Sequence, residues 1–296
     1  MQELASVLVA GILLGGIYGL VALGLNLIFG VVRTVNFAQG ELVMLSMYGT
    51  YWLYTRLHIT PYLAILVIVP AMFLLGLALQ RFILQPLQAE PMMQIFATFG
   101  LLMLFQNLIL GLTGGESLSV DWSLGRQVLG VDGLKFSLVR VVALGAMTLI
   151  TVGLHLFLYR TMAGKAVRAV IQDKRAARTM GINVERTYLL AFGVGAALAG
   201  VAGALLTPIY TLSPSIGGNF ILAAFAVVVL GGLGSVWGTY LGGLLVGVVE
   251  ALAGFYVDPD LRQAIWFLIF IAVLIVRPSG LLGQVGAEEV GFREQH

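Results

Sequence analysis

Side chains that could act as nucleophiles or metal ligands are scarce in this sequence. It has no cysteine and three histidines, His58, His155 and His296, which lie far apart and form no H-E-x-x-H metal motif. Ser235 stands in a glycine-rich run and could act as a nucleophile with His155 as its general base. A lone serine in such a run is far more often a packing residue. Enzyme is therefore the weakest function class, and it would require that Ser235→Ala abolish turnover.

The sequence also lacks the motif with which many proteins bind and hydrolyse ATP. The nearest approach is Gly164-Lys165-Ala166, which has neither the upstream glycine nor the following hydroxyl residue of G-x-x-x-x-G-K-[ST]. This chain therefore cannot hydrolyse ATP by a P-loop. We expect it to bind no metal and no cofactor of its own.

Polar side chains inside long apolar stretches are the other candidates for chemistry, because lipid penalises them unless they have a partner or a function. Amides can hand a polar solute along without binding it tightly. For any single residue an interhelical hydrogen bond is the somewhat better alternative. The set predicted to line a path is Asn36, Gln39, Gln94, Thr98, Gln106 and Asn107. Further candidates are Asn26, Glu41 and Glu250, of which the two carboxylates are expected near membrane interfaces.

The composition shows what kind of body must position these groups. Hydrophobic residues make up 59% of the 296 residues, charged residues 10%, and the mean hydropathy is +1.00. A soluble domain has roughly a quarter of its residues charged, so most of this surface must face lipid. The 38 glycines indicate helices that approach one another closely. A net charge of +2 gives no reason to expect nucleic acid as a partner.

The apolar runs predict an all-α, polytopic transmembrane bundle forming a single domain over residues 1–296. A helix needs about 20 apolar residues to cross a bilayer. The predicted spans are Leu4–Val32, Glu41–Thr55, Pro61–Gln80, Met92–Leu112, Leu138–Tyr159, Tyr188–Leu212, Phe220–Leu252 and Leu261–Val276. The second is short unless the polar stretch 34–40 lies at membrane depth. The seventh is broken at residues 231–238, which we interpret as two half-length or tilted helices, so the count is eight or nine.

Small residues recur every four positions on several of these spans. The sets are Gly11, Gly15 and Gly19; Gly195, Ala199 and Gly203; and Gly234, Gly238 and Gly242. Each set lines one helix face, where another backbone can come close. Tight helix packing is the favoured interpretation, and a sliding interface for alternating access would use the same residues.

Basic residues predict the orientation, because loops rich in Lys and Arg stay in the cytoplasm. The segment 160–187 holds seven of the sixteen basic residues and only two acidic ones. It is therefore expected to be cytoplasmic, which makes the loop 113–137 external. If 231–238 is a turn between two crossings, the tail with Arg277 is also cytoplasmic.

The stretch 164–183 predicts one or two short helices. Val167, Val170, Ile171, Lys174 and Arg178 share one face, and Gly181 is a natural helix end. A basic helix resting on anionic lipid is one interpretation. The alanine-rich pattern with a glycine at each end favours a compact element that enters a groove in a partner.

These residues resemble a known family. The segment 164–183 is similar to the cytoplasmic coupling loop of ABC-importer permeases, in which Gly, Ala and Asp precede a Gly-Ile/Leu-Asn exit. The similarity extends over nearly the whole chain and includes the runs 30–41, 191–203, 230–238 and 277–283. Together they resemble the branched-chain amino acid ABC transporter permeases, specifically the shorter of the two paired subunits. Permeases for urea or short amides have nearly the same motifs.

The resemblance implies a multi-pass protein of the bacterial inner membrane that transports and does not itself catalyse. Its partners would be a second permease subunit, two cytoplasmic ATPases that use ATP and Mg, and a periplasmic or extracellular binding protein that docks on 113–137 and the other outer loops. The substrate would be a branched-chain or related amino acid, with urea second. The resemblance places ATPase coupling on Gly164, Lys165, Arg168, Asp173, Ala177 and Gly181.

A stand-alone secondary transporter or channel is the alternative class. Secondary transporters usually need charged ion-coupling residues deep in the membrane, and this chain has almost none at the centres of its spans. The two classes differ in whether flux needs ATP and partner subunits.

Overall fold

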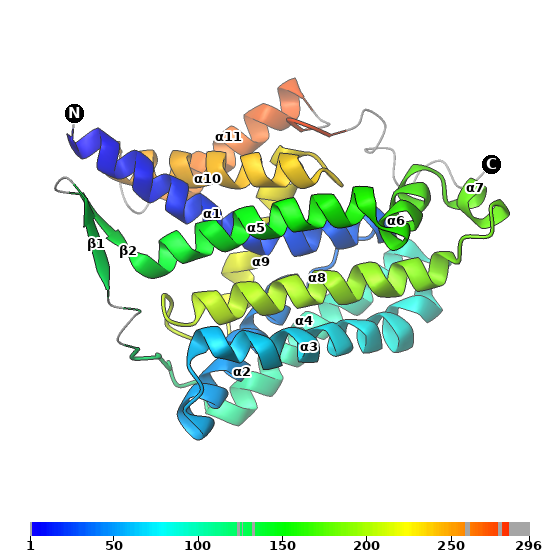
Figure 1. Cartoon of the computed structure of the whole chain (residues 1–296), viewed down its shortest axis with the longest axis horizontal. Coiled ribbons are helices and arrows are strands. Elements are labelled where there is room, and N and C mark those ends of the chain that lie inside the picture. The colour runs from blue at the N-terminus through cyan, green and yellow to red at the C-terminus, as the bar shows by residue number, and fades with distance from the viewer. Residues whose placement is uncertain are drawn as a thin grey trace.

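The structure is a computed structural model that describes residues 2–122, 125, 127–131, 134–257, 261–277 and 280–283. Helices run nearly parallel through most of the body, and their connections gather at its two ends (Figure 1). The helices are α1 (Gln2–Val32), α2 (Gln39–Leu57), α3 (Pro61–Leu79), α4 (Pro91–Thr113), α5 (Leu138–Arg160), α6 (Met162–Gln172), α7 (Lys174–Thr179), α8 (Val184–Leu206), α9 (Ile216–Gly231), α10 (Val236–Tyr256) and α11 (Arg262–Val276). The predicted all-α, polytopic bundle is confirmed.

Six helices of the described residues are long and apolar enough to cross a membrane. They lie within Glu3–Val32, Pro61–Leu87, Pro91–Thr113, Leu138–Arg160, Val184–Leu206 and Val236–Tyr256. Two more apolar helices, Ile216–Gly231 and Ala264–Val276, are shorter. The helix α2 is less apolar than any of these, and half of its residues are buried in the bundle. The long spans begin and end close to the predicted positions because proline and glycine mark their ends. Pro61 and Pro91 open α3 and α4, and Gly114 closes α4 with a left-handed φ of 64°.

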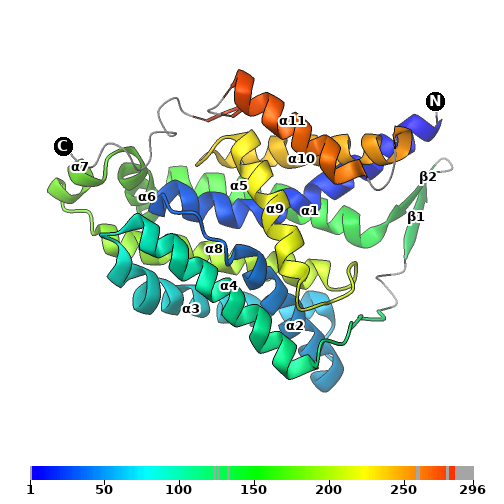
Figure 2. The ribbon, with the colours of Figure 1, turned by 180° about the vertical axis from the view of Figure 1, so that it is seen from behind.

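The first helix is the axis of one half of the molecule, where it packs against α10, α5 and α9 (Figures 1 and 2). Its contact with α10 is a seam of glycines. A Cβ on Gly11 would lie 2.7 Å from Cα of Val248, and one on Gly15 would lie 2.6 Å from the carbonyl oxygen of Gly243. Real Cβ atoms are never this close to backbone, so these positions require glycine. The predicted packing role of the first glycine set is confirmed.

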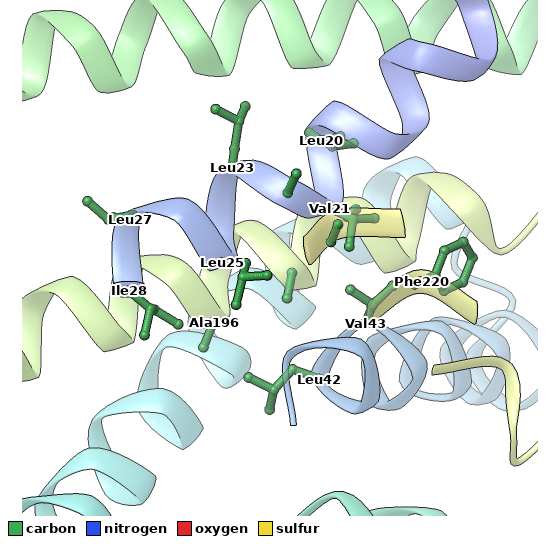
Figure 3. Packing of buried hydrophobic residues seen from close by; sticks show 14 of the residues in the cluster. Leu20, Val21, Leu23, Leu25, Leu27, Ile28, Leu42, Val43, Ala196 and Phe220 are labelled. Atoms are coloured by element: carbon green, nitrogen blue, oxygen red, sulfur yellow. The ribbon is translucent and has the colours of Figure 1, made fainter. Parts of the chain in front are cut away.

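The same helix also contributes to the centre of the apolar core. Figure 3 shows Val21, Leu25 and Ile28 of α1 facing side chains from three other elements. Those partners include Leu42 and Val43 of α2, Ala196 of α8 and Phe220 of α9, all buried. Between helices in a membrane such side chains stabilise the packing through van der Waals contact, because lipid tails are as apolar as the side chains themselves. The core therefore packs the start of α2 and the short helix α9 against the continuous helix α1.

The connection between α1 and α2 folds back into the bundle. Thr34, Asn36 and Gln39 are buried, so this polar stretch belongs to the interior, as it must if the short second span is to be completed. In Figure 2 the segment runs below α1, between α8 and α4.

The predicted break in the seventh span is a turn at residues 232–235 between α9 and α10. Gly232 and Gly234 have left-handed φ values of 103° and 80°, which side chains rarely adopt. The break separates two helices, α9 with 16 residues and α10 with 21, so α10 is longer than half a span. After α11 the chain returns to this turn, where the Leu281 and Leu282 N–H groups donate to the carbonyls of Leu230 and Gly231 at 2.8 and 3.0 Å.

The opposite end of the bundle carries a small two-stranded antiparallel ribbon. Strands β1 (Val128–Val131) and β2 (Leu134–Ser137) pair with Val128 opposite Ser137. Nearby, Leu118 and Leu212 exchange two backbone hydrogen bonds, 3.0 and 2.7 Å long. The predicted external loop 113–137 therefore lies at the end of the molecule away from α6 and α7 (Figure 1), though residues 123, 124, 126, 132 and 133 lie outside the described part.

Candidate coupling segment and translocation path

The predicted coupling segment forms two short helices, α6 and α7, that extend beyond the end of the bundle (Figure 1). The Thr161 hydroxyl caps α6 by accepting a hydrogen bond from the Gly164 N–H at 2.9 Å. Gly164 is buried against the end of α5, where a Cβ would meet the Phe157 carbonyl and lie 2.5 Å from Cα of Leu158. Glycine at this position lets α6 turn sharply away from α5.

Asp173 separates α6 from α7. Its carboxylate caps α7 by accepting hydrogen bonds from the N–H groups of Arg175 and Ala176 at 2.7 and 2.9 Å. The Ala176 N–H, and after it that of Arg175, lowers the pKa of Asp173 below its ordinary value. The carboxylate therefore stays charged, and the cap is lost only as the pH falls through this lowered pKa. The break also places Lys174 and Arg178 on a second helix, so the single face predicted for them and Val167 is divided.

Gly181 ends α7 as predicted, with a φ of 83°. The Ile182 N–H donates to the Ala177 carbonyl at 3.0 Å, which closes the turn, and Ala177 itself is buried. Asn183 then caps α8 through a 3.0 Å bond from the Arg186 N–H. Caps at both ends of each element give a segment whose shape is fixed by local hydrogen bonds.

The cations of this segment divide into two groups. Arg168 turns inward, with Nε donating to the Leu158 carbonyl at 2.9 Å and its guanidinium 4.2 Å from the ring centre of Tyr159. Lys165 and Arg178 are exposed. Of the six residues predicted to couple, the structure gives Gly164, Arg168, Asp173, Ala177 and Gly181 roles in shaping the element. Asp173 also lies at its surface, as does Lys165.

Four of the six residues predicted to line the path come together. The Thr34 hydroxyl donates to Oε1 of Gln94 at 2.6 Å, and Nε2 of Gln94 donates to the Leu84 carbonyl at 3.0 Å. Thr98 accepts from the Phe37 N–H at 3.3 Å and lies 3.3 Å from the Val35 carbonyl. Through these bonds the buried segment 34–38 is attached to α4.

The other two members of that cluster attach the segment to α8. Asn36 accepts a 3.1 Å bond from the Ala38 N–H and donates to Gln39, whose Nε2 lies 3.4 Å from the Gly195 carbonyl. Gly24 of α1 leaves room for this contact, since a Cβ there would lie 2.6 Å from both Gln39 Nε2 and the Gly195 oxygen. We call the group formed by Thr34, Asn36, Gln39, Gln94 and Thr98 the polar joint.

Gln106 and Asn107 do not belong to the polar joint. They lie further along α4, where Gln106 is half-buried and Asn107 is exposed. The Asn107 amide donates to the Met103 carbonyl of its own helix at 2.8 Å. Gln106 lies eight residues after Thr98 on the same helix, away from the segment 34–38. The polarity of a side chain alone does not show this separation.

The remaining polar candidates hold broken parts of the chain. Asn26 accepts a 2.7 Å bond from the Gly234 N–H, which fixes the α9–α10 turn to α1. Glu41 was expected near a membrane interface. It is 1% exposed and lies against Gly217 at the start of α9, so protein encloses its carboxylate. Positive ends of two helices, α2 and α9, face its carboxylate there. Glu250 is also buried and accepts a 3.1 Å bond from the Tyr18 hydroxyl.

Ser235 and His155 have neighbours that suit packing. The Ser235 hydroxyl caps α10 by accepting from the Gly238 N–H at 3.1 Å, and the His155 ring lies against the rings of Tyr159 and Trp237. Within the described ranges no group of three or more His, Asp or Glu side chains could hold a metal ion.

Three residues of the site were missed. Thr34 and Arg33 stand in the polar stretch after the first span, and the sequence assigned neither of them to the path or to coupling. Gln80 is fully buried, and neither of its side-chain polar atoms has a hydrogen-bond partner among the described residues. It opens a π-helical turn, Gln80–Leu84, which is a recurrent feature of functional sites. Its position after an uncharged span was the available signal.

Comparison with known proteins decides the family. The family model described as "Branched-chain amino acid transport system / permease component" matches residues 7–274. The chain belongs to this family. The predicted resemblance is therefore confirmed, and the protein is a multi-pass inner-membrane permease subunit of an ABC importer. It is a transport component, as its relatives are.

Relatives of nearly the same length support this membership. The high-affinity branched-chain amino acid permease LivH of Salmonella typhimurium is 29% identical, with 95% of this chain and 96% of LivH covered. BraD of Pseudomonas aeruginosa is 31% identical, with 96% and 97% covered. The probable LivH of Methanocaldococcus jannaschii is 30% identical, with 94% and 92% covered. No solved structure matches significantly.

Proposed function

We propose that this permease receives branched-chain or related amino acids from a binding protein and carries them inward. It is paired with a second permease subunit and driven by two cytoplasmic ATPases. The observation that carries the substrate class is the near-full-length match to LivH and BraD, both named as high-affinity branched-chain amino acid permeases. Urea or a short amide is the second candidate, and none of the relatives above favours it.

Coupling is assigned to α6 and α7. They project from one end of the bundle, they are capped at both ends, and the segment 160–187 carries an excess of basic residues. A compact element of fixed shape can transmit a push from an ATPase, whereas a flexible loop would absorb it. Gly164, Arg168, Ala177 and Gly181 fix that shape, and Lys165 and Asp173 lie where a partner can contact them.

The path is assigned to the polar joint. Its amides and hydroxyls are buried in the helical bundle and hydrogen-bond across three elements, α4, α8 and the segment 34–38. Such bonds can be exchanged for bonds to a polar solute at small net cost, because each contributes only about 1 kcal/mol net. Gln106 and Asn107 remain weaker candidates, since they lie apart from the joint.

Reconstitution in proteoliposomes tests the function. The complete complex, supplied with ATP and binding protein, should accumulate leucine, and the binding protein should prefer leucine to urea. Gradient-driven flux by this chain alone, without ATP or partner subunits, would instead support the secondary-transporter class and contradict the importer.

Two variants test the coupling assignment within that assay. Asp173→Ala and Arg168→Gln should abolish uptake while the chain remains inserted and abundant, because the first removes the α7 cap and the second removes the hydrogen bond from α6 to the Leu158 carbonyl of α5. Ser235→Ala, which removes a cap from α10 outside the segment 160–187, is the matched control and should retain most uptake per folded chain. Normal uptake and normal ATPase stimulation in both test variants would remove the assignment.

A further inference from the structure

Arg33 stands at the point where α1 ends and the buried segment 34–38 begins. Its N–H makes the last hydrogen bond of α1, to the Phe29 carbonyl at 2.8 Å. Its φ of 58° is left-handed, a strained conformation for a residue with a Cβ. Strain of this kind persists only where surrounding contacts hold the backbone in that conformation.

The side chain of Arg33 reaches the cytoplasmic segment. Its Nη2 donates to the carbonyl of Ile171, in the last turn of α6, at 2.7 Å. Carbonyls in the last turn of a helix lack partners within it, and a cation there also interacts favourably with the helix dipole. Arg33 is near enough to Asp173 for its charge to act on that carboxylate. The guanidinium therefore sits at the junction between α6 and α7.

The backbone after Arg33 is attached to the interior of the helical bundle. Thr34 donates to Gln94, and the Val35 carbonyl lies 3.3 Å from the Thr98 hydroxyl. One residue thus joins two regions, with its side chain on the junction of α6 and α7 and its main chain leading directly into the polar joint. Among the described hydrogen bonds, no other side chain links the segment 33–39 to α6 or α7.

We propose that Arg33 is the positioning residue through which movement of the α6–α7 junction is transmitted to the polar joint. The proposal rests on the proposed function, since it assumes that an ATPase moves α6 and α7. When the junction shifts, the short charge-assisted bond carries residue 33 with it, and the strained backbone there can then change conformation. Residues 34–36 follow because they are next in the chain.

Substitutions at Arg33 separate this role from simple stabilisation. Arg33→Asn keeps a residue that tolerates the left-handed conformation but removes the guanidinium. In the complete complex it should lower uptake about tenfold or more while leaving ATP hydrolysis nearly unchanged, because a hydrogen bond to a charged donor is lost. Arg33→Lys, which keeps a cation, should recover part of the uptake. The control is His58→Asn, at the other left-handed non-glycine position, which ends α2.

The chain has no cysteine, so a single introduced thiol can report movement of the polar joint. Val35→Cys adds a thiol of similar size to a half-buried position. Its rate of reaction with a membrane-permeant maleimide should differ between the nucleotide-free and ATP–vanadate-trapped complex. That difference should disappear in Arg33→Asn and persist in His58→Asn.

Three results would overturn the proposal. They are unchanged uptake per ATP hydrolysed in Arg33→Asn, a nucleotide-dependent Val35→Cys rate that survives this substitution, and a rate that does not depend on nucleotide in the parent. A chain that neither binds the ATPases nor stimulates them would instead contradict the proposed function itself. Co-purification of the ATPases with the parent chain distinguishes these two failures.

Discussion

Two contacts, one along the first helix and one just beyond its end, show how differently a membrane protein can join its elements. The seam between α1 and α10 is built from glycines, with Gly11 and Gly15 against the backbone of Gly243, Gly247 and Val248. The polar joint, a few residues beyond the end of α1, is built from side-chain hydrogen bonds between Thr34, Gln94 and their neighbours.

The two contacts respond differently to movement. Backbones in van der Waals contact have many simultaneous partners, and any displacement loses them together. Hydrogen bonds between amides and hydroxyls can be exchanged one at a time with other polar groups, including a solute. We therefore interpret the seam as the fixed part of the permease and the polar joint as the part that changes during transport.

The largest expected effect comes from filling the seam. Gly15→Leu places a side chain where a Cβ alone would lie 2.6 Å from the Gly243 oxygen, so α1 and α10 must separate. Overpacking of this kind costs about 1–3 kcal/mol or more. The midpoint of thermal unfolding in detergent should fall sharply, and with it the yield of folded protein. Gly145→Leu is the control, because nothing lies within 4 Å of a Cβ there, and equal behaviour of the two variants would contradict the rigid seam.

The second effect is on transport. Gln94→Leu leaves the Thr34 hydroxyl and the Leu84 carbonyl without their partner, which costs about 1–3 kcal/mol for each buried group. Uptake should fall by more than tenfold, whereas the ATPases should still assemble with the chain. Gln106→Leu changes an amide on the same helix outside the polar joint and should retain uptake. A larger loss from Gln106→Leu would move the path away from the joint.

A smaller effect is expected at the end of the seam. Ser235→Ala removes the cap of α10, and loss of a cap costs about 0.5–2 kcal/mol of stability. Uptake by the remaining folded protein should be normal, measured per unit of chain in the membrane. Loss of activity in a stably folded Ser235→Ala protein would revive a chemical role for this serine.

The smallest effect is expected at Asn107, which is exposed and bonded within its own helix. Asn107→Leu should change neither thermal stability nor uptake measurably, since it removes one exposed polar group from a lipid-facing surface. A clear loss of uptake would show that the path extends along this side of α4 and is not confined to the joint.

The long spans were predictable because hydropathy and helix-end residues are local properties. Pro61, Pro91 and Gly114 mark the ends of their helices in the sequence and in the structure. The glycine set Gly11, Gly15 and Gly19 predicted the face that packs, although not that α10 is its partner. The sequence allowed one helix or two over 164–183. The structure divides them at Asp173, whose carboxylate caps the second helix.

The arrangement of the polar residues could not be predicted in the same way. Gln94 and Gln106 are both amides on one uncharged helix, and only tertiary contacts show that one meets Thr34 and the other does not. Glu41 was placed at an interface because buried charge is costly. Its actual neighbour Gly217, in the first turn of α9, is 176 positions away and leaves no local signal.

Distances between spin labels test the comparison between the two contacts most directly, since the cysteine-free chain permits pairs at exposed positions. Ile12→Cys with Leu241→Cys spans the seam, and Met93→Cys with Arg175→Cys spans from α4 to α7. In the complete complex, trapping with ATP and vanadate should leave the first distance unchanged and alter the second. A shift across the seam with a constant distance between α4 and α7 would contradict the account.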